Sequence, residues 1–294
     1  MRWNKITLVG VGLLGGSLGL AVKHRRLARE VAGYVRRETS IKDCAQAGAV
    51  DFATTDLLAA AWDADLVILC TPLAQMRSLV KQLLPALKRG AIVTDVGSVK
   101  ASVVKDVETL VEQAGAHFIG SHPMAGGEQT GVSAARADLF ESAMCVVTPT
   151  KRTHRAALRK VEQFWKSVGG RLISLTPEMH DALVSRSSHL PHLVAATLAA
   201  LVLDPKHPKQ QAALCARGFL DTTRVASSSP EMWRDIALTN RAQLRATLDE
   251  FVRELQRVQR ILRRGKTAEV EDLFQTAKAR RDRWRAVCVS PSSE

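Results

Sequence analysis

The chain has 294 residues, of which 46% are hydrophobic and 24% charged, and it contains five cysteines. This composition is typical of globular domains and excludes both a disordered chain and a disulfide scaffold. Because no two cysteines form a C-x-x-C pair, we expect free thiols, a cytoplasmic location and no structural zinc. The net charge of +13 allows nucleic acid, an acidic membrane or an anionic small molecule as a partner.

The N-terminus imitates a signal peptide, because a basic start precedes the apolar run from Ile6 to Val22. Glycines interrupt this run, a basic cluster ends it, and no clear cleavage site follows. No other uncharged stretch reaches the roughly 18 residues of a membrane span. We therefore expect no membrane partner, and a folded domain from the start of the chain.

Up to about residue 175, short apolar runs alternate with segments of helical period, which predicts a parallel sheet with helices on both faces. The predicted strands are Ile6 to Val9, Val31 to Val35, Leu66 to Cys70, Ala91 to Asp95, His117 to Ile119, Met144 to Val147 and Leu172 to Leu175. The predicted helices are Leu14 to Lys23, Ser40 to Ala47, Ala74 to Leu87, Val99 to Ala114 and His154 to Val168.

The pattern changes after Pro177, where long stretches of 3.6-residue period replace the β-rich runs. We predict an all-helical domain over 176–285 and a disordered tail over 286–294. The longest helix of this domain is predicted from about Pro230 to Leu262, with a length of roughly 45 to 50 Å. A helix of that length needs a partner to bury its apolar face, so we expect a homodimer through this domain.

A glycine motif, Gly10-Val11-Gly12-Leu13-Leu14-Gly15, joins the first strand to the first helix. In this context a G-x-G-x-x-G motif binds the pyrophosphate of a dinucleotide at the helix N-terminus. Thr71 and Pro72, which follow the third predicted strand, are further candidates for cofactor contact. The sequence therefore predicts an α/β protein in which an N-terminal Rossmann-type dinucleotide-binding domain, residues 1–175, precedes an all-helical dimerisation domain.

The end of the second predicted strand bears on the choice of cofactor. Enzymes of this fold that use NAD usually place an acidic residue there, where this chain has Val35 followed by Arg36 and Arg37. Two guanidinium groups can bind the 2′-phosphate of NADP, so we expect NADP. The alternative is NAD, with Glu38 contacting the ribose and both arginines solvated.

Ser98 and His122 follow the predicted strands that end at Asp95 and Ile119, at the edge where open α/β sheets bind ligands. A histidine there can act as a general base. Ser98 can contact a ligand, cap the next helix, or do both. In the second domain, His189 and His192 are three residues apart on a predicted helix, and because no carboxylate accompanies them at ligand spacing we expect no metal.

Several motifs together resemble those of the prephenate and arogenate dehydrogenases of tyrosine biosynthesis. They are the runs Gly10 to Ser17, Asp95 to Lys100, Gly120 to Gly126, Ser188 to His192 and Gly218 to Ala226, with Met232 to Asp235. The resemblance covers residues 5 to 285. It implies oxidative decarboxylation of prephenate to 4-hydroxyphenylpyruvate with hydride transfer to NAD(P). Action on arogenate, or on both substrates, is the alternative.

The resemblance also implies roles for individual residues. His122 would be the catalytic base, and Ser98 would orient the substrate hydroxyl. Arg224 would bind a substrate carboxylate, and Ser188, His189 and His192 would lie on a helix that covers the substrate. Glu128 would lie at the rim of the site. The family often has a basic residue four positions before this arginine, where this chain has Leu220.

Two other classes remain open from the sequence. Hydroxyisobutyrate and 6-phosphogluconate dehydrogenases combine similar domains, but they use a catalytic lysine, and the stretch from Met179 to Leu203 contains none. A non-enzymatic protein that senses dinucleotides or binds DNA is suggested only by the charge. That reading leaves Ser98, His122 and Arg224 unexplained, so we expect no nucleic-acid partner.

Overall fold

The computed structural model describes residues 2–127 and 129–288. Its contacts divide the chain into two compact units, 1–244 and 245–294. The predicted domain border at residue 175 falls inside the first unit, between the last strand and the helix that begins at Pro177.

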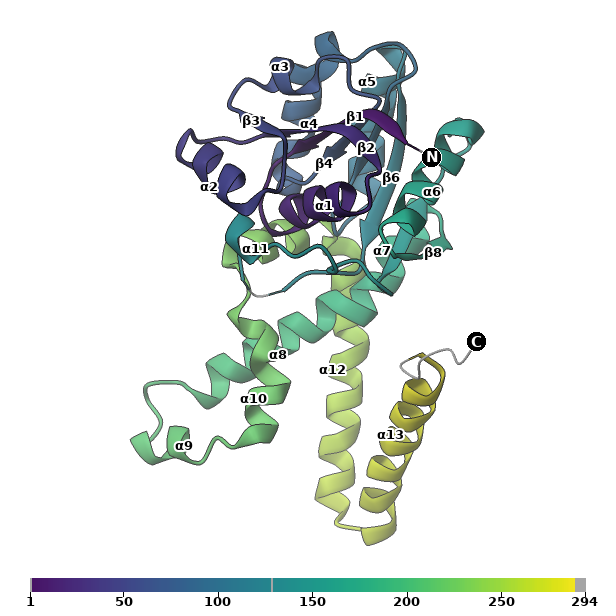
Figure 1. Cartoon of the computed structure of the whole chain (residues 1–294). Helices are drawn as coiled ribbons and strands as arrows, with labels where there is room; N and C mark the ends of the chain where they lie inside the picture. The colour runs from purple at the N-terminus through teal and green to yellow at the C-terminus, as the bar shows by residue number, and fades with distance from the viewer. Residues whose placement is uncertain (1, 128, 289–294) are drawn as a thin grey trace. The chain divides into compact units, whose positions relative to one another are not determined.

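An eight-stranded sheet forms the centre of the first unit, with the strand order β3-β2-β1-β4-β5-β6-β7-β8 (Figure 1). Its strands are β1 (Trp3–Val9), β2 (Ala28–Tyr34), β3 (Phe52–Thr54), β4 (Leu66–Leu69), β5 (Ile92–Asp95), β6 (His117–Pro123), β7 (Met144–Thr148) and β8 (Arg171–Ser174). The pairs from β3 to β6 are parallel, so their carboxyl ends lie at one edge.

Two apolar clusters cover the two faces of this sheet. One contains side chains of α1 (Leu13–His24), α2 (Thr39–Ala47) and α6 (Arg155–Ser167). The other contains side chains of α3 (Leu57–Ala61), α4 (Leu73–Leu83) and α5 (Ala101–Gln113). Burial on both faces explains why strands such as Leu66–Leu69 are continuous apolar runs. The predicted α/β fold with a Rossmann-type first part is confirmed.

Two features of the sheet differ from the prediction. The short edge strand β3 and the five-residue helix α3 were not predicted, because neither is long enough to show a period. The prediction of a wholly parallel sheet is wrong at β7, which pairs antiparallel with β6. Among the described residues that connect them, the 3-10 turn η2 (Val132–Ala134) is the only helical element, and a chain that makes no helical crossover returns antiparallel to the strand it left.

The rest of the first unit is helical. It contains α7 (Pro177–Val184), the π-helical turn η3 (Ser185–His189), α8 (Leu190–Val202), α9 (Lys209–Ala213), α10 (Arg217–Thr223), the 3-10 turn η4 (Arg224–Ser227) and α11 (Pro230–Thr239). A further 3-10 turn, η1 (Leu84–Ala86), follows α4. The dimerisation region predicted from the sequence is therefore helical, as expected.

The predicted helix from Pro230 to Leu262 is wrong in its continuity. It is divided at Asn240 into α11 and α12 (Arg241–Arg264). Asn240 leaves the helical conformation, with φ −100° and ψ 27°, and its side chain is buried. The last helix, α13 (Thr267–Cys288), extends three residues into the predicted tail, and 289–294 lie outside the described residues.

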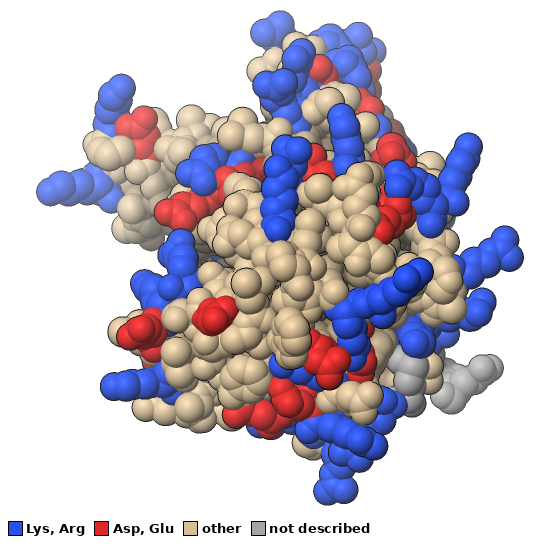
Figure 2. All heavy atoms as spheres, turned by 90° about the horizontal axis from the view of Figure 1, so that it is seen from above, with Lys and Arg blue, Asp and Glu red and all other residues tan. Residues whose placement is uncertain are grey.

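The excess positive charge does not form a single stripe on the visible face. Figure 2 shows lysine and arginine side chains interspersed with acidic ones over that face. No helix within residues 2–127 and 129–288 is both long enough and apolar enough to cross a membrane.

Candidate active site

The glycine motif forms a tight turn between β1 and α1. Gly10 has φ +97°, and a Cβ atom there would lie 2.9 Å from the carbonyl oxygen of Cys70. A Cβ atom on Gly15 would lie 2.0 Å from the carbonyl oxygen of Gly10. Both positions therefore require glycine, which brings β1, β4 and α1 into close contact.

The same turn leaves space and donors for a phosphate group. A Cβ atom on Gly12 would meet nothing within 4 Å, and neither a side-chain cap nor an acidic residue occupies the first turn of α1. Leu13 and Leu14 begin that turn and are half-buried. Thr71 Oγ1 is buried and has no hydrogen-bond partner among the described residues, and Pro72 beside it occupies the N-cap position of α4. These features fit a dinucleotide whose pyrophosphate lies at the helix N-terminus.

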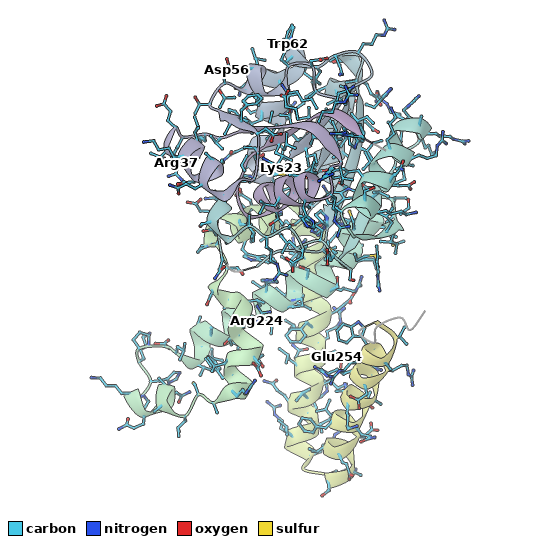
Figure 3. All side chains as sticks on the ribbon, in the orientation of Figure 1. Lys23, Arg37, Asp56, Trp62, Arg224 and Glu254 are labelled. Carbon is cyan, nitrogen blue, oxygen red and sulfur yellow. The ribbon has the colours of Figure 1, made fainter. Side chains whose placement is uncertain are left out.

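Arg36 and Arg37 lie directly beyond β2 and are exposed. The preceding Val35 is buried, and its backbone N–H donates to the carbonyl of Thr54. Glu38 forms the N-cap position of α2 without a side-chain cap bond. Figure 3 shows Arg37 at the margin of the sheet, pointing outward. Both guanidinium groups are thus accessible at the edge of the cradle where a ribose would lie.

His122 lies near the carboxyl end of β6 and is only 6% exposed. Its Nδ1 atom is 2.8 Å from Nε2 of His180, which is completely buried on α7. Burial lowers the pKa of His122 well below its usual value, and His180, Lys100 and His189 lower it further. His122 is therefore in its neutral, proton-accepting form at neutral pH.

Sequence reasoning missed His180 and the neighbouring Asp181. His180 Nδ1 lies 2.7 Å from Asp181 Oδ1. The Asp181 carboxylate also accepts the backbone N–H groups of Lys100, at 2.7 Å, and Ala101, at 2.9 Å. The only signal in the sequence was a His-Asp pair in the first turns of α7. Such a pair predicts no function by itself, because its role here comes from the contact of Asp181 with the start of α5 in the folded chain.

A buried ion pair lies behind His122. Lys100 and Asp95 are both completely buried and joined through Nζ and Oδ2, and Lys100 Nζ also donates to the carbonyl of Ser121 at 2.8 Å. The Asp95 carboxylate accepts the backbone N–H of Gly97 at 2.9 Å and of Ser121 at 3.1 Å. These bonds fix the loop after β5 to the strand that carries His122, so the Asp95 to Lys100 motif has a structural role.

Ser98 is half-buried in that same loop. The possibility that it caps the next helix is excluded, because α5 begins at Ala101 and the Asp181 carboxylate accepts the N–H groups there. The backbone of Ser98 lies against the imidazole of His189. The side chain of Ser98 therefore does not cap α5. The loop that carries Ser98 lies close to His189, which belongs to the helical part of the site.

The motif from Ser188 to His192 spans the π-helical turn η3 and the start of α8. π-helical turns within helices frequently occur at functional sites. His189 is 1% exposed, and its Nδ1 accepts from the side-chain amide of Asn240 at 3.1 Å. Burial lowers the pKa of His189 to about 4, so Nδ1 is an acceptor at neutral pH.

His192 is half-buried and stacks on Trp233 of α11, with 3.8 Å between ring centroids. His189 meets the same indole edge-on at 6.0 Å. His192 Nδ1 donates to the carbonyl of Ser188 at 3.0 Å, which leaves Nε2 as an acceptor. The two histidines predicted to share a helical face thus contact one tryptophan, which sequence reasoning did not assign to the site.

Arg224 begins the 3-10 turn η4 and is exposed. This turn packs against α8, the helix that carries His192, and Figure 3 shows Arg224 beside that helix. Leu220 is also exposed, one helical turn earlier. Glu128 lies outside the described residues.

A separate cavity of about 800 Å³ opens at the other edge of the sheet, where β6 begins. It is lined by Arg89, Gly90, Glu112, Gly115, Ala116, His117, Arg152, Thr153, His154 and Arg155. None of these residues belongs to the cluster around His122.

Comparisons with known proteins match both parts of the chain. Residues 18–174 match the family model described as prephenate dehydrogenase, nucleotide-binding domain. Residues 176–277 match the model described as prephenate dehydrogenase, dimerization domain.

Individual relatives match nearly the whole chain. A prephenate dehydrogenase of Bacillus subtilis is 34% identical over 284 residues, which are 95% of this chain and 76% of that protein. Among solved structures, prephenate dehydrogenase from Aquifex aeolicus, in complex with hydroxyphenyl propionate and NAD⁺, has a TM-score of 0.88 and 32% identity, covering 96% of this chain and 99% of the other. Arogenate dehydrogenase of Synechocystis has a TM-score of 0.80 and 31% identity, covering 95% and 99%.

Proposed function

The chain belongs to the prephenate dehydrogenase family, and from this premise we propose that it converts prephenate to 4-hydroxyphenylpyruvate and CO₂ in tyrosine biosynthesis. The single observation that carries the assignment is the position of His122. It is a buried, neutral histidine at the carboxyl end of β6, on the same sheet edge as the glycine cradle. A base is needed at that place to take a proton beside a bound dinucleotide.

The proposed reaction needs three things from the protein: removal of the ring hydroxyl proton, orientation of that hydroxyl, and binding of two anionic groups. His122 accepts the proton, and Ser98 in the loop after β5 orients the hydroxyl. As the carbinol carbon is oxidised to a ketone, the ring C–CO₂⁻ bond breaks. Its electron pair enters the ring and makes it aromatic, so the cluster around His122 only has to start the reaction.

The charged and aromatic groups of the helical region support the binding role. Arg224 is proposed to bind a substrate carboxylate, for which a bidentate guanidinium is the suitable donor. Ser188, His189 and His192 are proposed to cover the substrate, and Nε2 of His192 offers the accepting atom. Trp233 supports this part of the site by holding both imidazole rings. Glu128 remains proposed at the rim.

The nicotinamide dinucleotide accepts the hydride when it is bound. The residues Gly10, Gly12, Leu13, Leu14 and Gly15, with Thr71 and Pro72, are proposed to hold it. We propose NADP as the preferred cofactor, since Arg36 and Arg37 are exposed at the end of β2 and no acidic residue stands at Val35. NAD is the alternative.

Prephenate and arogenate differ only by a keto group against an ammonium group on the side chain, and relatives named for each substrate match this chain. Steady-state assays with both substrates and both cofactors test the proposal. We expect prephenate oxidation, detected as absorbance of the reduced nicotinamide and as 4-hydroxyphenylpyruvate. Turnover of arogenate alone would shift the assignment to arogenate dehydrogenase, and turnover of neither would refute it.

We further propose a homodimer formed through the helical region, in agreement with the name of the matching family model. The stretch from Pro230 to Leu262 is divided at Asn240, so the length of a single helix does not support this dimer, but exposed apolar side chains of the helical region, such as Leu201, Leu214 and Leu220, do. Sedimentation is expected to give twice the chain mass. The described cysteines Cys44, Cys70, Cys145 and Cys215 are free, which supports the proposed cytoplasmic location.

A further inference from the structure

Three side chains form a continuous hydrogen-bonded row that begins at His122. His122 Nδ1 contacts His180 Nε2 at 2.8 Å, and His180 Nδ1 contacts Asp181 Oδ1 at 2.7 Å. His122, His180 and Asp181 are all buried. Both ring nitrogens of His180 are hydrogen-bonded within the row. The donor or acceptor role of one nitrogen therefore determines the role of the other.

The direction of the row follows from Asp181. Its carboxylate accepts two backbone N–H groups at the N-terminus of α5, from Lys100 and Ala101, so it acts as an acceptor on every side. His180 must then carry its proton on Nδ1 and present the lone pair of Nε2 to His122. His122 therefore carries its proton on Nδ1, and its own lone pair lies on Nε2.

We propose that His180 and Asp181 are positioning residues that hold His122 in the tautomer with a free Nε2 lone pair and stabilise it after it accepts a proton. The proposal rests on the proposed function, in which His122 is the base. The proton leaves the substrate hydroxyl and forms a bond with Nε2 of His122. The resulting imidazolium shares its Nδ1–H with His180, and the Asp181 carboxylate compensates the charge without itself becoming protonated.

The charged and titratable groups around His122 make this compensation necessary. Lys100, His180 and His189 face it and disfavour its protonated form, and the thiol of Cys145 on β7 is neutral because burial raises its pKa. The charge of Lys100 is paired with Asp95. Burial and the charge of Lys100 lower the pKa of His180, whereas the hydrogen bond and charge of Asp181 and the charge of Asp95 raise it. Asp181 is the one of these two carboxylates that is hydrogen-bonded to the row.

The first test is Asp181→Asn. Asp181 Oδ1 accepts from both His180 and Lys100, and Oδ2 accepts from Ala101. An asparagine oxygen in the place of Oδ1 would keep the bond to His180, but the side chain would no longer carry the charge that compensates the imidazolium. We expect kcat to fall by about 10-fold or more, with KM changed by less than about 3-fold. An unchanged kcat would overturn the proposal.

The matched control is Asp56→Asn. Asp56, labelled in Figure 3, is exposed and also accepts two backbone N–H groups at a helix N-terminus, from Leu58 and Ala59. Its hydrogen bonds among the described residues include none to a histidine. A purely structural role of Asp181 in capping α5 would lower thermal stability in both variants and leave kcat nearly unchanged in both. The proposal requires loss of kcat in Asp181→Asn alone.

The second test compares His180→Gln with His180→Leu. Glutamine can place an acceptor oxygen near the former Nε2 and keep the His122 tautomer, whereas leucine cannot. We expect His180→Gln to keep at least about ten times the kcat of His180→Leu, and equal rates would contradict the proposal.

The tautomer can also be read without turnover. In wild-type protein labelled with ¹⁵N-histidine, the ring nitrogens of His122, assigned from the spectrum of His122→Asn, should show protonation on Nδ1. Protonation on Nε2 would overturn the proposal even if prephenate is oxidised. Conversely, an inactive wild type with the Nδ1 tautomer would refute the proposed function and leave the row intact.

Discussion

The side-chain amide of Asn240 donates to the backbone carbonyl of Asp181 at 2.9 Å and also reaches Nδ1 of His189 at 3.1 Å. This one residue ends α11 and joins it to α7 and to η3. It therefore holds the helices that carry Trp233, His180 and His189 in register. The residue at which the long predicted helix is divided is thus the residue that connects α11 to Asp181 and His189.

We expect Asn240→Ala to lower the free energy of unfolding by about 1 to 3 kcal/mol, because it leaves Nδ1 of the buried His189 without its donor and removes the side-chain bond to the carbonyl of Asp181, which keeps the backbone N–H of Ser185. Urea unfolding followed by circular dichroism measures the effect. Asn4→Ala is the control, since Asn4 is exposed and its side chain makes no hydrogen bond among the described residues. Equal stability of the two variants would show that the Asn240 bonds contribute little.

The sequence predicted the parts of this site that lie on single motifs. The turn at Gly10 and Gly15 and the position of His122 at the carboxyl edge of the sheet follow from local spacing, although β6 extends to Pro123 and contains His122 instead of ending before it. Asn240, His180 and Asp181 could not be found in this way. Their meaning depends on contacts between segments about 60 to 80 positions apart, such as Asp181 with Lys100 and Ala101.

The same limit explains the error in the long helix. The apolar period of Leu238, Leu244 and Leu248 continues through Asn240, so the pattern indicates one helix. A buried tertiary bond interrupts it, and no local propensity records that bond. The antiparallel return of β7 is a similar case, since strand direction depends on what crosses the sheet between two strands.

We expect His122→Asn to lower kcat by about two to four orders of magnitude, the usual contribution of a positioned general base. Asparagine places an amide near the former Nδ1, so the contact with His180 can survive while the proton-accepting Nε2 is lost. KM should change less than kcat. His117→Asn, at the start of the same strand and stacked on His154, is the control and should keep near-normal kinetics.

Near-normal turnover by His122→Asn would exclude His122 as the base. Circular dichroism and thermal melting of both variants should accompany the kinetics. A loss of kcat in proportion to a loss of folded protein would indicate a structural role of His122 and not a role as the base.

We expect Arg224→Ala to raise KM for prephenate by about 30-fold or more, equivalent to about 2 to 4 kcal/mol for a charge-assisted contact. A carboxylate clamp acts in the ground state and the transition state alike, so kcat should change little. Arg224→Lys should recover only part of the affinity, because lysine cannot form the bidentate pair. Arg257→Ala, an exposed arginine paired with Glu254, is the control. A fall in kcat alone would assign Arg224 a different role.

The buried histidines predict how stability depends on pH. Burial lowers the pKa of His189 to about 4, whereas an unfolded histidine has a pKa of about 6.5. Between these values the unfolded state binds more protons, so the free energy of unfolding falls as the pH falls from about 6.5 to about 4. The loss from His189 alone is up to about 3 kcal/mol.

Urea titrations at several pH values measure this loss. His189→Gln should flatten the curve in that range, while His207→Gln, at an exposed position, should leave the slope unchanged. The slope should not vanish in His189→Gln, because burial also lowers the pKa of His122 and of His180. Identical slopes in all three proteins would contradict the proton assignment.

Two exposed arginines at the end of β2 predict a preference for NADP over NAD. Arg36 and Arg37 are exposed directly after β2, and Val35 stands where NAD enzymes of this fold usually place an acid. We expect kcat/KM to be higher for NADP than for NAD in the wild type. In the double variant Arg36→Ala, Arg37→Ala, most of that preference should disappear through a higher KM for NADP, with NAD kinetics nearly unchanged.

The control for this pair is Arg29→Ala together with Arg26→Ala, which removes two charges near the start of β2 and away from its carboxyl end. If general positive charge attracted the extra phosphate, both double variants would lose NADP affinity to a similar degree at low salt, and added salt would abolish the difference. A direct contact predicts a loss in the Arg36 and Arg37 variant alone. A wild type that prefers NAD would instead favour Glu38 as the ribose partner, and Glu38→Gln should then raise KM for NAD.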